Sequence, residues 1–155
     1  MVSLLRTGRV MSMAGSRYVL TEFSASTEEK YIRDRIYELL SSGYKPIVAH
    51  IERYKCMKDI ELVEYLVNKG AYMQVNADSV IGKNGHGVKK YCGKLLEDEL
   101  VQFIGSDCHG SKRRVTRIGD AYAYVSKKFG RQAADEIFID NPQEILDNAK
   151  HCLSL

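Results

Sequence analysis

Short apolar runs alternate along this chain with segments in which apolar residues recur every three or four positions. The runs predict four strands, at 18–23, 46–50, 71–76 and 100–105. The helical spacing predicts helices after each strand. The segments that show this spacing are 32–40, 60–67, 88–97, 117–129, 132–137 and the segment from Asn141 onward. Regular alternation of strand and helix is typical of βαβ units. We therefore expect an α/β fold with about four parallel strands and flanking helices.

Local signals refine the expected helix boundaries. Ser26, with Glu29 three residues later, matches a capping box and predicts a helix start at that point. Asp59 is suited to cap the helix that follows the second strand, and Pro142 suits the first turn of the last helix because proline has no N–H to satisfy. The segment 4–8 has the pattern of a helix end followed by a loop. No strand precedes it, so we expect that elements upstream of this sequence are missing.

Composition and charge narrow the class of protein. The chain has 155 residues, which suits one domain, and it is 45% hydrophobic and 28% charged, which excludes bulk disorder. The formal net charge of +3 is too small to indicate a nucleic-acid or membrane partner. The sequence shows no apolar run long enough to span a membrane and no secretory leader, so we expect the cytoplasm. The four cysteines form no C-x-x-C pair and are expected to be free thiols.

Chemistry-bearing residues follow the predicted strands. Glu22 ends the first strand, His50 the second, and Asp107 and His109 follow the fourth. Ligands of parallel α/β sheets bind at the carboxyl ends of the strands, so these four side chains are expected to converge. Residues i and i+2 at a strand end point to the same side, so the spacing predicts that Asp107 and His109 both reach one metal cluster. Carboxylates with imidazoles form a ligand set for a divalent metal such as Mn, Fe or Zn.

Four segments also carry a family resemblance. Residues 18–23, 46–54 with the motif Ala-His-x-Glu-Arg-Tyr, 74–79, and 103–109 with the motif Ser-Asp-x-His resemble the bacterial PHP-domain tyrosine phosphatases of the CpsB/CapC/YwqE type. The resemblance covers nearly the whole chain, in order. It implies a distorted (β/α) barrel of seven strands, with up to three metal ions, usually manganese, at the strand ends. It also implies a role in capsule and exopolysaccharide control through dephosphorylation of phosphotyrosine by metal-activated water.

The resemblance assigns roles to individual residues. It makes Glu22, His50, Asp107 and His109 the metal ligands. Arg53 resembles an arginine that binds the substrate phosphate, and Arg114, with Arg113 beside it, is the expected second phosphate-binding arginine. Arginine suits this role because its planar group can bind two phosphate oxygens at once. The implied partner is a phosphotyrosine protein such as the tail of a bacterial tyrosine kinase, with no nucleic acid and no membrane insertion.

One departure from the family pattern is large. Members of the family begin with a His-x-His strand and further Asp, His and Glu ligands, whereas the only histidines here are His50, His86, His109 and His151. We therefore interpret residues 1–155 as a single truncated domain, a partial PHP barrel whose N-terminal strands are missing. Fewer than three metals and little or no phosphatase activity are expected of it. Exposed sheet edges are expected to favour self-association.

Three alternatives remain open at this point. Cys108 to Arg114 formally matches C-x5-R, the pattern of a cysteine phosphatase, but the pattern is short and chance matches are frequent. Another PHP phosphoesterase, such as a histidinol-phosphate phosphatase or a polymerase-associated exonuclease, would show a similar Asp-x-His. The basic run Lys112-Arg113-Arg114, together with Arg117, could also belong to a non-catalytic binding module.

Overall fold

A four-stranded parallel sheet organises the protein. The computed structural model describes residues 2–108 and 116–153. The strands are β1 (Tyr18–Thr21), β2 (Lys45–Val48), β3 (Tyr72–Asn76) and β4 (Phe103–Gly105). They pair in the order β1-β2-β3-β4, every pair is parallel, and the register places Tyr18 beside Lys45 and Gln74 beside Phe103. The predicted α/β class with four parallel strands is confirmed.

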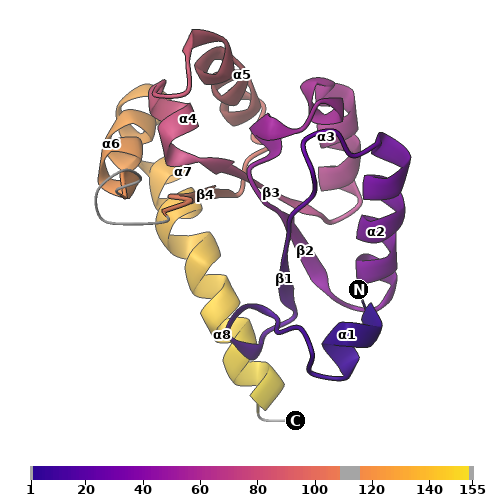
Figure 1. The fold of residues 1–155 in the computed structure, drawn as a ribbon. Helices are drawn as coiled ribbons and strands as arrows, with labels where there is room; N and C mark the ends of the chain where they lie inside the picture. Colours follow the sequence, from indigo (N-terminus) through magenta and orange to yellow (C-terminus); the bar gives the residue numbers. More distant parts are fainter. Residues whose placement is uncertain (1, 109–115, 154–155) are drawn as a thin grey trace.

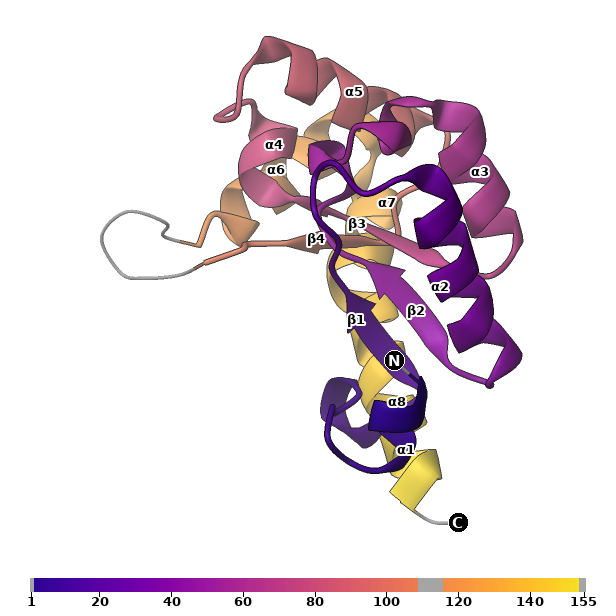
Figure 2. The ribbon, with the colours of Figure 1, turned by 45° about the vertical axis from the view of Figure 1, so that its right-hand side comes forward.

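Helices flank this sheet and connect its strands (Figure 1). The α-helices are α1 (Val2–Arg6), α2 (Glu29–Ser41), α3 (Ile60–Asn68), α4 (Ala77–Ile81), α5 (His86–Glu97), α6 (Ile118–Phe129), α7 (Arg131–Asp135) and α8 (Asn141–Leu153). The 3₁₀ helices are η1 (Met13–Gly15), η2 (Ile51–Arg53) and η3 (Cys56–Lys58), and η4 (Glu136–Asp140) is a single π-helical segment. Helices α2 and α3 lie together on one side of the strands (Figure 2).

Alternation along the strands divides the core between the two faces of the sheet. Val19 points toward α2, where it packs with Leu39, whereas Tyr18 points to the opposite face. On that opposite face Tyr18 packs with Ile47, Phe103 and, from α8, Ile145. Because both faces of a parallel sheet must be covered, its strands are almost continuously apolar. This explains why the strands were readable from the sequence as apolar runs.

The helix starts match the sequence signals only in part. Asp59 caps α3, since its carboxylate accepts a hydrogen bond from the backbone N–H of Glu61 at 3.0 Å. The predicted capping box is wrong. Helix α2 begins at Glu29 with Glu28 at the cap position, and the Ser26 hydroxyl lies 3.4 Å from that of Ser24. The chain turns there instead, with the N–H of Thr27 bonded to the carbonyl of Ser24. The short helix α4 was not predicted because five residues are too few to show a period.

Two expectations from composition concern the cysteines and the membrane. None of the four cysteines, Cys56, Cys92, Cys108 and Cys152, forms a disulfide, as expected. Over residues 2–108 and 116–153, every helix is too short or too polar to cross a lipid bilayer.

The outer edge of β1 leads to a prediction about association. β1 is at one end of the strand order, and Leu20 on this strand is 53% exposed. Unpaired strand edges beside apolar side chains favour pairing with another chain. We expect concentration-dependent self-association, which light scattering coupled to size-exclusion chromatography would measure. Leu20→Lys should shift the equilibrium toward monomer, whereas Tyr37→Lys, on an exposed position of α2, should not. A wild-type monomer at high concentration would contradict this expectation.

Candidate functional site

The candidate site is a concavity where the strands end. Its volume is about 460 Å³, and it is bounded on one side by polar strand-end residues and on the other by apolar side chains of the sheet face. The polar residues that line it are Glu22, His50, Gln74, Asn76 and Asp107. Three of the four ligands predicted from the sequence therefore face one cavity. The fourth, His109, lies outside the described residues, as do Arg113 and Arg114.

Glu22 and His50 form the first polar pair of the site. Nε2 of His50 lies 2.9 Å from Oε1 of Glu22. His50 follows β2 and has a φ of 38°, in the left-handed region that non-glycine residues rarely occupy. Its side chain is buried beside the ring of Tyr54, and its Nδ1 atom is buried with no hydrogen-bond partner among the described atoms. Such local strain at a strand end is common at functional sites, where the surrounding structure holds it in place.

Tyr54 supports this pair from behind. Its hydroxyl oxygen accepts a hydrogen bond from the backbone N–H of Phe23 at 3.0 Å, which fixes the segment that carries Glu22. Burial raises the pKa of Tyr54 to about 12, so the ring stays neutral at physiological pH. Tyr54 belongs to the Ala-His-x-Glu-Arg-Tyr motif, but its role was not assigned from the sequence.

Gln74 connects the strand ends through its side-chain amide. Its Oε1 accepts the backbone N–H of His50 at 2.9 Å, and its Nε2 donates to Val75 O and to Asn76 Oδ1. No role was predicted for Gln74 or Asn76 from the sequence, although both lie in β3 near its carboxyl end. Polar residues in a strand that is otherwise buried are the signal that identifies them.

Gly105 provides the space that Gln74 occupies. A Cβ atom at residue 105 would lie 2.5 Å from Nε2 of Gln74. Gly105→Ala is therefore expected to displace the Gln74 amide and to lower the free energy of unfolding by about 1–3 kcal/mol, as overpacking of a tight interior does. Urea unfolding would measure this change. Gly119→Ala, where no atom lies within 4 Å of the added Cβ, is the matched control. Equal stability of the two variants would contradict the expectation.

Asp107 forms the second polar pair of the site, with Arg53. Arg53 lies in η2, directly after β2, and its Nη2 makes an ion pair with Oδ2 of Asp107. Nδ2 of Asn76 also donates to Oδ2 of Asp107, at 3.4 Å. The spacing argument for Asp107 is wrong, because β4 ends at Gly105 and Asp107 has a φ of 48°, which interrupts the strand alternation. Asp107 reaches the site through a left-handed turn instead.

The described residues fit part of a metal centre. Two donor atoms that bind one ion at about 2.1 Å and at a right angle lie about 3.0 Å apart. The 2.9 Å between Glu22 and His50 matches this separation, and a nitrogen with a carboxylate oxygen suits first-row divalent metals. In the part of the chain that the structure describes, no three His, Cys, Asp or Glu side chains gather closely enough to hold an ion. The structure therefore gives two candidate ligands side by side and a third, Asp107, at the same cavity.

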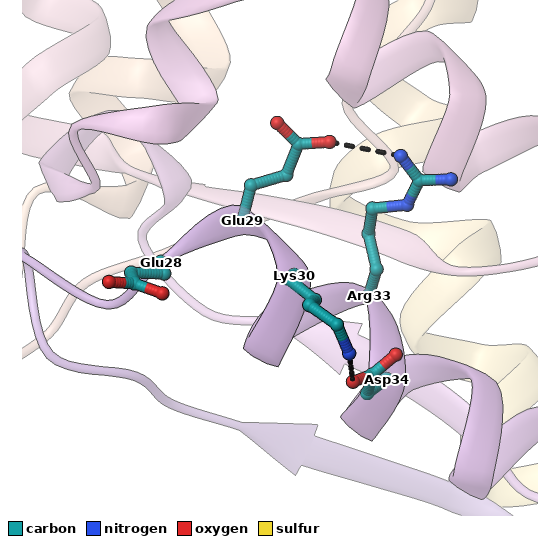
Figure 3. Close-up of a pocket in the computed structure, with 5 residues that line it drawn as sticks. All are labelled: Glu28, Glu29, Lys30, Arg33 and Asp34. Atoms are coloured by element: carbon teal, nitrogen blue, oxygen red, sulfur yellow. Dashed lines mark hydrogen bonds and ion pairs between the residues drawn. The ribbon is translucent and has the colours of Figure 1, made fainter.

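A second concavity, on the surface of α2, is not the functional site. Its lining is made of Glu28, Glu29, Lys30, Arg33 and Asp34 (Figure 3). Two ion pairs join these charges along the helix, Arg33 with Glu29 at 3.0 Å and Lys30 with Asp34 at 2.7 Å. Pairs at this spacing on an exposed helix face stabilise the helix only weakly, and they leave little charge for a ligand.

A parallel α/β sheet whose strand ends carry carboxylates, an imidazole and an arginine defines a class of α/β proteins with a candidate metal and anion site. A family model described as "Capsular polysaccharide synthesis, CpsB/CapC" matches residues 1–147. This chain belongs to that family. The resemblance seen in the sequence is thereby confirmed.

Individual relatives agree with the family match. The chain is 32% identical over 154 residues to the "Tyrosine-protein phosphatase CpsB" of Streptococcus agalactiae serotype V, which covers 96% of this chain and 63% of the relative. It is 34% identical over 148 residues to the protein of that name from Streptococcus pneumoniae, which covers 92% of this chain and 61% of the relative. The chain thus spans less than two thirds of the length of these relatives.

A solved structure has the same fold. A chain from the crystal structures of YwqE from Bacillus subtilis and CpsB from S. pneumoniae, described as "unique metal-dependent tyrosine phosphatases", superimposes with a TM-score of 0.78. The two chains are 28% identical, and the match covers 99% of this chain and 60% of the other. This chain therefore shares its fold with the matched part of this structural neighbour.

Proposed function

We propose that this chain carries part of the active site of a metal-dependent tyrosine phosphatase that acts in capsule and exopolysaccharide control. One observation carries the proposal. In a chain of the CpsB/CapC family, Glu22, His50 and Asp107 line a single cavity at the carboxyl ends of parallel strands, and Arg53 makes an ion pair with Asp107. The names of the relatives give the reaction class, and the residues at this cavity are of the types that reaction needs.

The fold detail belongs to the same proposal. Strands in the sequential order β1-β2-β3-β4, all parallel, are what consecutive units of a (β/α) barrel provide. We interpret residues 1–155 as one domain with the architecture of a partial, distorted PHP barrel. The similarity to a chain of which only 60% is matched supports this interpretation.

Metal binding and phosphate binding are assigned to different residues in this proposal. Glu22, His50 and Asp107 would hold divalent cations, with His109 as a further ligand and manganese as the proposed metal, iron and zinc being the alternatives. When bound, the cations neutralise charge on the phosphoryl oxygens and activate water. Arg53 binds and orients the phosphoryl group through its paired N–H donors, and Arg113 and Arg114 are proposed for the same task. The proposed substrate is a phosphotyrosine protein in the cytoplasm, such as a bacterial tyrosine kinase tail.

The number of ligands sets the expected activity of the 155-residue chain. Its sequence contains no His-x-His, so fewer ligands are available than three coordination spheres need. We expect this chain alone to bind manganese and phosphate but to hydrolyse phosphotyrosine peptides slowly, because incomplete ligand sets lose affinity and fixed geometry. Phosphate release from a phosphotyrosine peptide, with and without manganese, measures this. Manganese-independent hydrolysis, or no binding of either ion, would count against the proposed function.

Two variants separate the metal mechanism from the cysteine mechanism. Asp107→Asn is expected to weaken manganese-dependent phosphopeptide binding and to remove the residual turnover, since it deletes a charged oxygen from the site. Cys108→Ser is expected to leave both unchanged. A cysteine phosphatase would show the reverse, because the thiolate is then the nucleophile. The neighbouring positions of the two residues make each variant a control for the other.

A further inference from the structure

A buried carboxylate beside the candidate site has no role in the functions proposed so far. Glu52 lies between His50 and Arg53 in the turn after β2 and is only 4% exposed. In the described part of the chain, no lysine or arginine makes an ion pair with it. A buried charge without a partner of opposite sign is costly, so the position of Glu52 needs a reason beyond packing.

The side-chain hydrogen bonds of Glu52 lead to the junction of β3 and α4. Its Oε1 accepts from the hydroxyl of Ser79 at 2.7 Å and from the backbone N–H of Asn76 at 3.2 Å. Ser79 is itself held by Nδ2 of Asn84, at 2.9 Å. The other carboxylate oxygen, Oε2, is buried and has no partner among the described atoms. One side chain thus ties the turn after β2 to the segment that follows β3.

These contacts close a ring around the candidate phosphate site. The backbone of Asn76 is bound by Glu52, and the side chain of Asn76 donates to Asp107. Asp107 makes the ion pair with Arg53, and Arg53 is covalently joined to Glu52. Four residues from three strand ends are therefore linked in a closed series of contacts. The side chain of Arg53 is held at its backbone end through Glu52 and at its guanidinium through Asp107.

Two neighbouring side chains, Cys92 and Lys58, do not compete for the groups that bind the carboxylate of Glu52. Cys92 of α5 lies nearby, and burial, followed by the negative charge of Glu52, raises the pKa of its thiol to about 12. The thiol is therefore neutral and does not compete as an anion for the same donors. The ammonium of Lys58 is bonded to the backbone carbonyl of Glu52, at 3.2 Å, and so supports the turn rather than the carboxylate.

We propose that Glu52 is a positioning residue, which aims Arg53 at the phosphoryl group by anchoring the turn after β2 to Asn76 and Ser79. The inference rests on the proposed function in one respect, namely that Arg53 binds phosphate. The ordering of Arg53 itself can be observed without any ligand. Groups that orient the direct contacts of a site typically alter affinity about 10–100-fold when they are removed.

The test compares Glu52→Gln with wild type and with Glu64→Gln, a matched change at an exposed position of α3. Nitrogen-15 NMR of the metal-free chain reports the order of Arg53 through its Nε–H signal, and the Asn76 amide shift reports the bond to residue 52. In Glu52→Gln, we expect a lower heteronuclear NOE at Arg53 Nε, a shifted Asn76 amide, and orthophosphate binding weakened about tenfold or more by calorimetry. Glu64→Gln should match wild type in all three measurements.

The result that would overturn the inference is a folded Glu52→Gln variant with an unchanged Arg53 signal and unchanged phosphate affinity. If Glu52→Gln does not fold, Ser79→Ala replaces it, because that change removes the shorter of the two bonds and should move the same signals in the same direction. A folded Ser79→Ala with no change would equally overturn it. A third result separates the two proposals. If Glu52→Gln loses the order of Arg53 but the wild-type chain binds no phosphate, the positioning role is supported and only the proposed function is contradicted.

Discussion

Replacing His50 by alanine is expected to remove specific binding of divalent cations by this chain. His50 supplies the only imidazole that the described residues place at the candidate cavity, with its Nε2 atom 2.9 Å from Glu22. When a site has so few ligands, the removal of one of them removes most of its affinity for the cation. We expect manganese affinity to fall by at least the roughly 10–100-fold that the loss of a supporting partner costs. Electron paramagnetic resonance of free manganese would measure it.

The control for this prediction is His86→Ala, because His86 is exposed at the start of α5 and does not line the candidate cavity. That variant should bind manganese like wild type. His50 is buried, so thermal unfolding must show that His50→Ala is folded at the temperature of the titration. A folded His50→Ala variant with wild-type manganese affinity would place the cation elsewhere and would contradict the assignment of the Glu22–His50 pair.

The sequence predicted the fold well where hydrophobic burial determines structure. The strands of a parallel sheet covered on both faces appear as apolar runs, and Ile32, Ile36 and Leu39 of α2 are buried at helical spacing. Prediction was weaker at boundaries, where local hydrogen bonds decide. Ser26 has the right spacing for a capping box, yet the chain forms a turn there and the helix begins later. Such a choice depends on how the preceding strand is held, which a local pattern does not contain.

The site was predicted as a set of residues but not as a set of contacts. The rule that ligands gather at strand ends was sufficient to select Glu22, His50 and Asp107. The contact between Asp107 and Arg53 depends on the register of neighbouring strands and on the left-handed turn at Asp107, neither of which is visible in a spacing. The buried hydrogen bonds of Gln74 and Glu52 also depend on side chains from separate strands. Their signal in the sequence was only that polar residues stand where apolar ones are expected.

Replacing Arg53 by glutamine is expected to change phosphate and metal binding in opposite directions. Charge-assisted hydrogen bonds contribute about 1.5–3 kcal/mol each, so loss of the guanidinium should weaken orthophosphate binding by about 10–100-fold. The same change should raise manganese affinity. Among the described residues, Arg53 makes an ion pair with Asp107, and a metal ion that uses the same carboxylate oxygen must displace this pair. Because the Arg53 side chain is 39% exposed, the pair contributes at most about 1 kcal/mol, which limits the gain to about fivefold.

Calorimetric titrations of manganese and of orthophosphate into one preparation of the variant test both directions together. Lys55→Gln is the matched control, since Lys55 is an exposed cation two residues away that has no contact with the cavity. It should leave both affinities unchanged. A general loss of positive charge would weaken phosphate binding and raise cation affinity in both variants, so only a change confined to Arg53→Gln supports the specific pair. If manganese affinity falls in Arg53→Gln, then Arg53 stabilises the metal site instead of competing with it. In that case the ion pair holds Asp107 in place for the metal, and the expected competition between Arg53 and the metal ion is wrong.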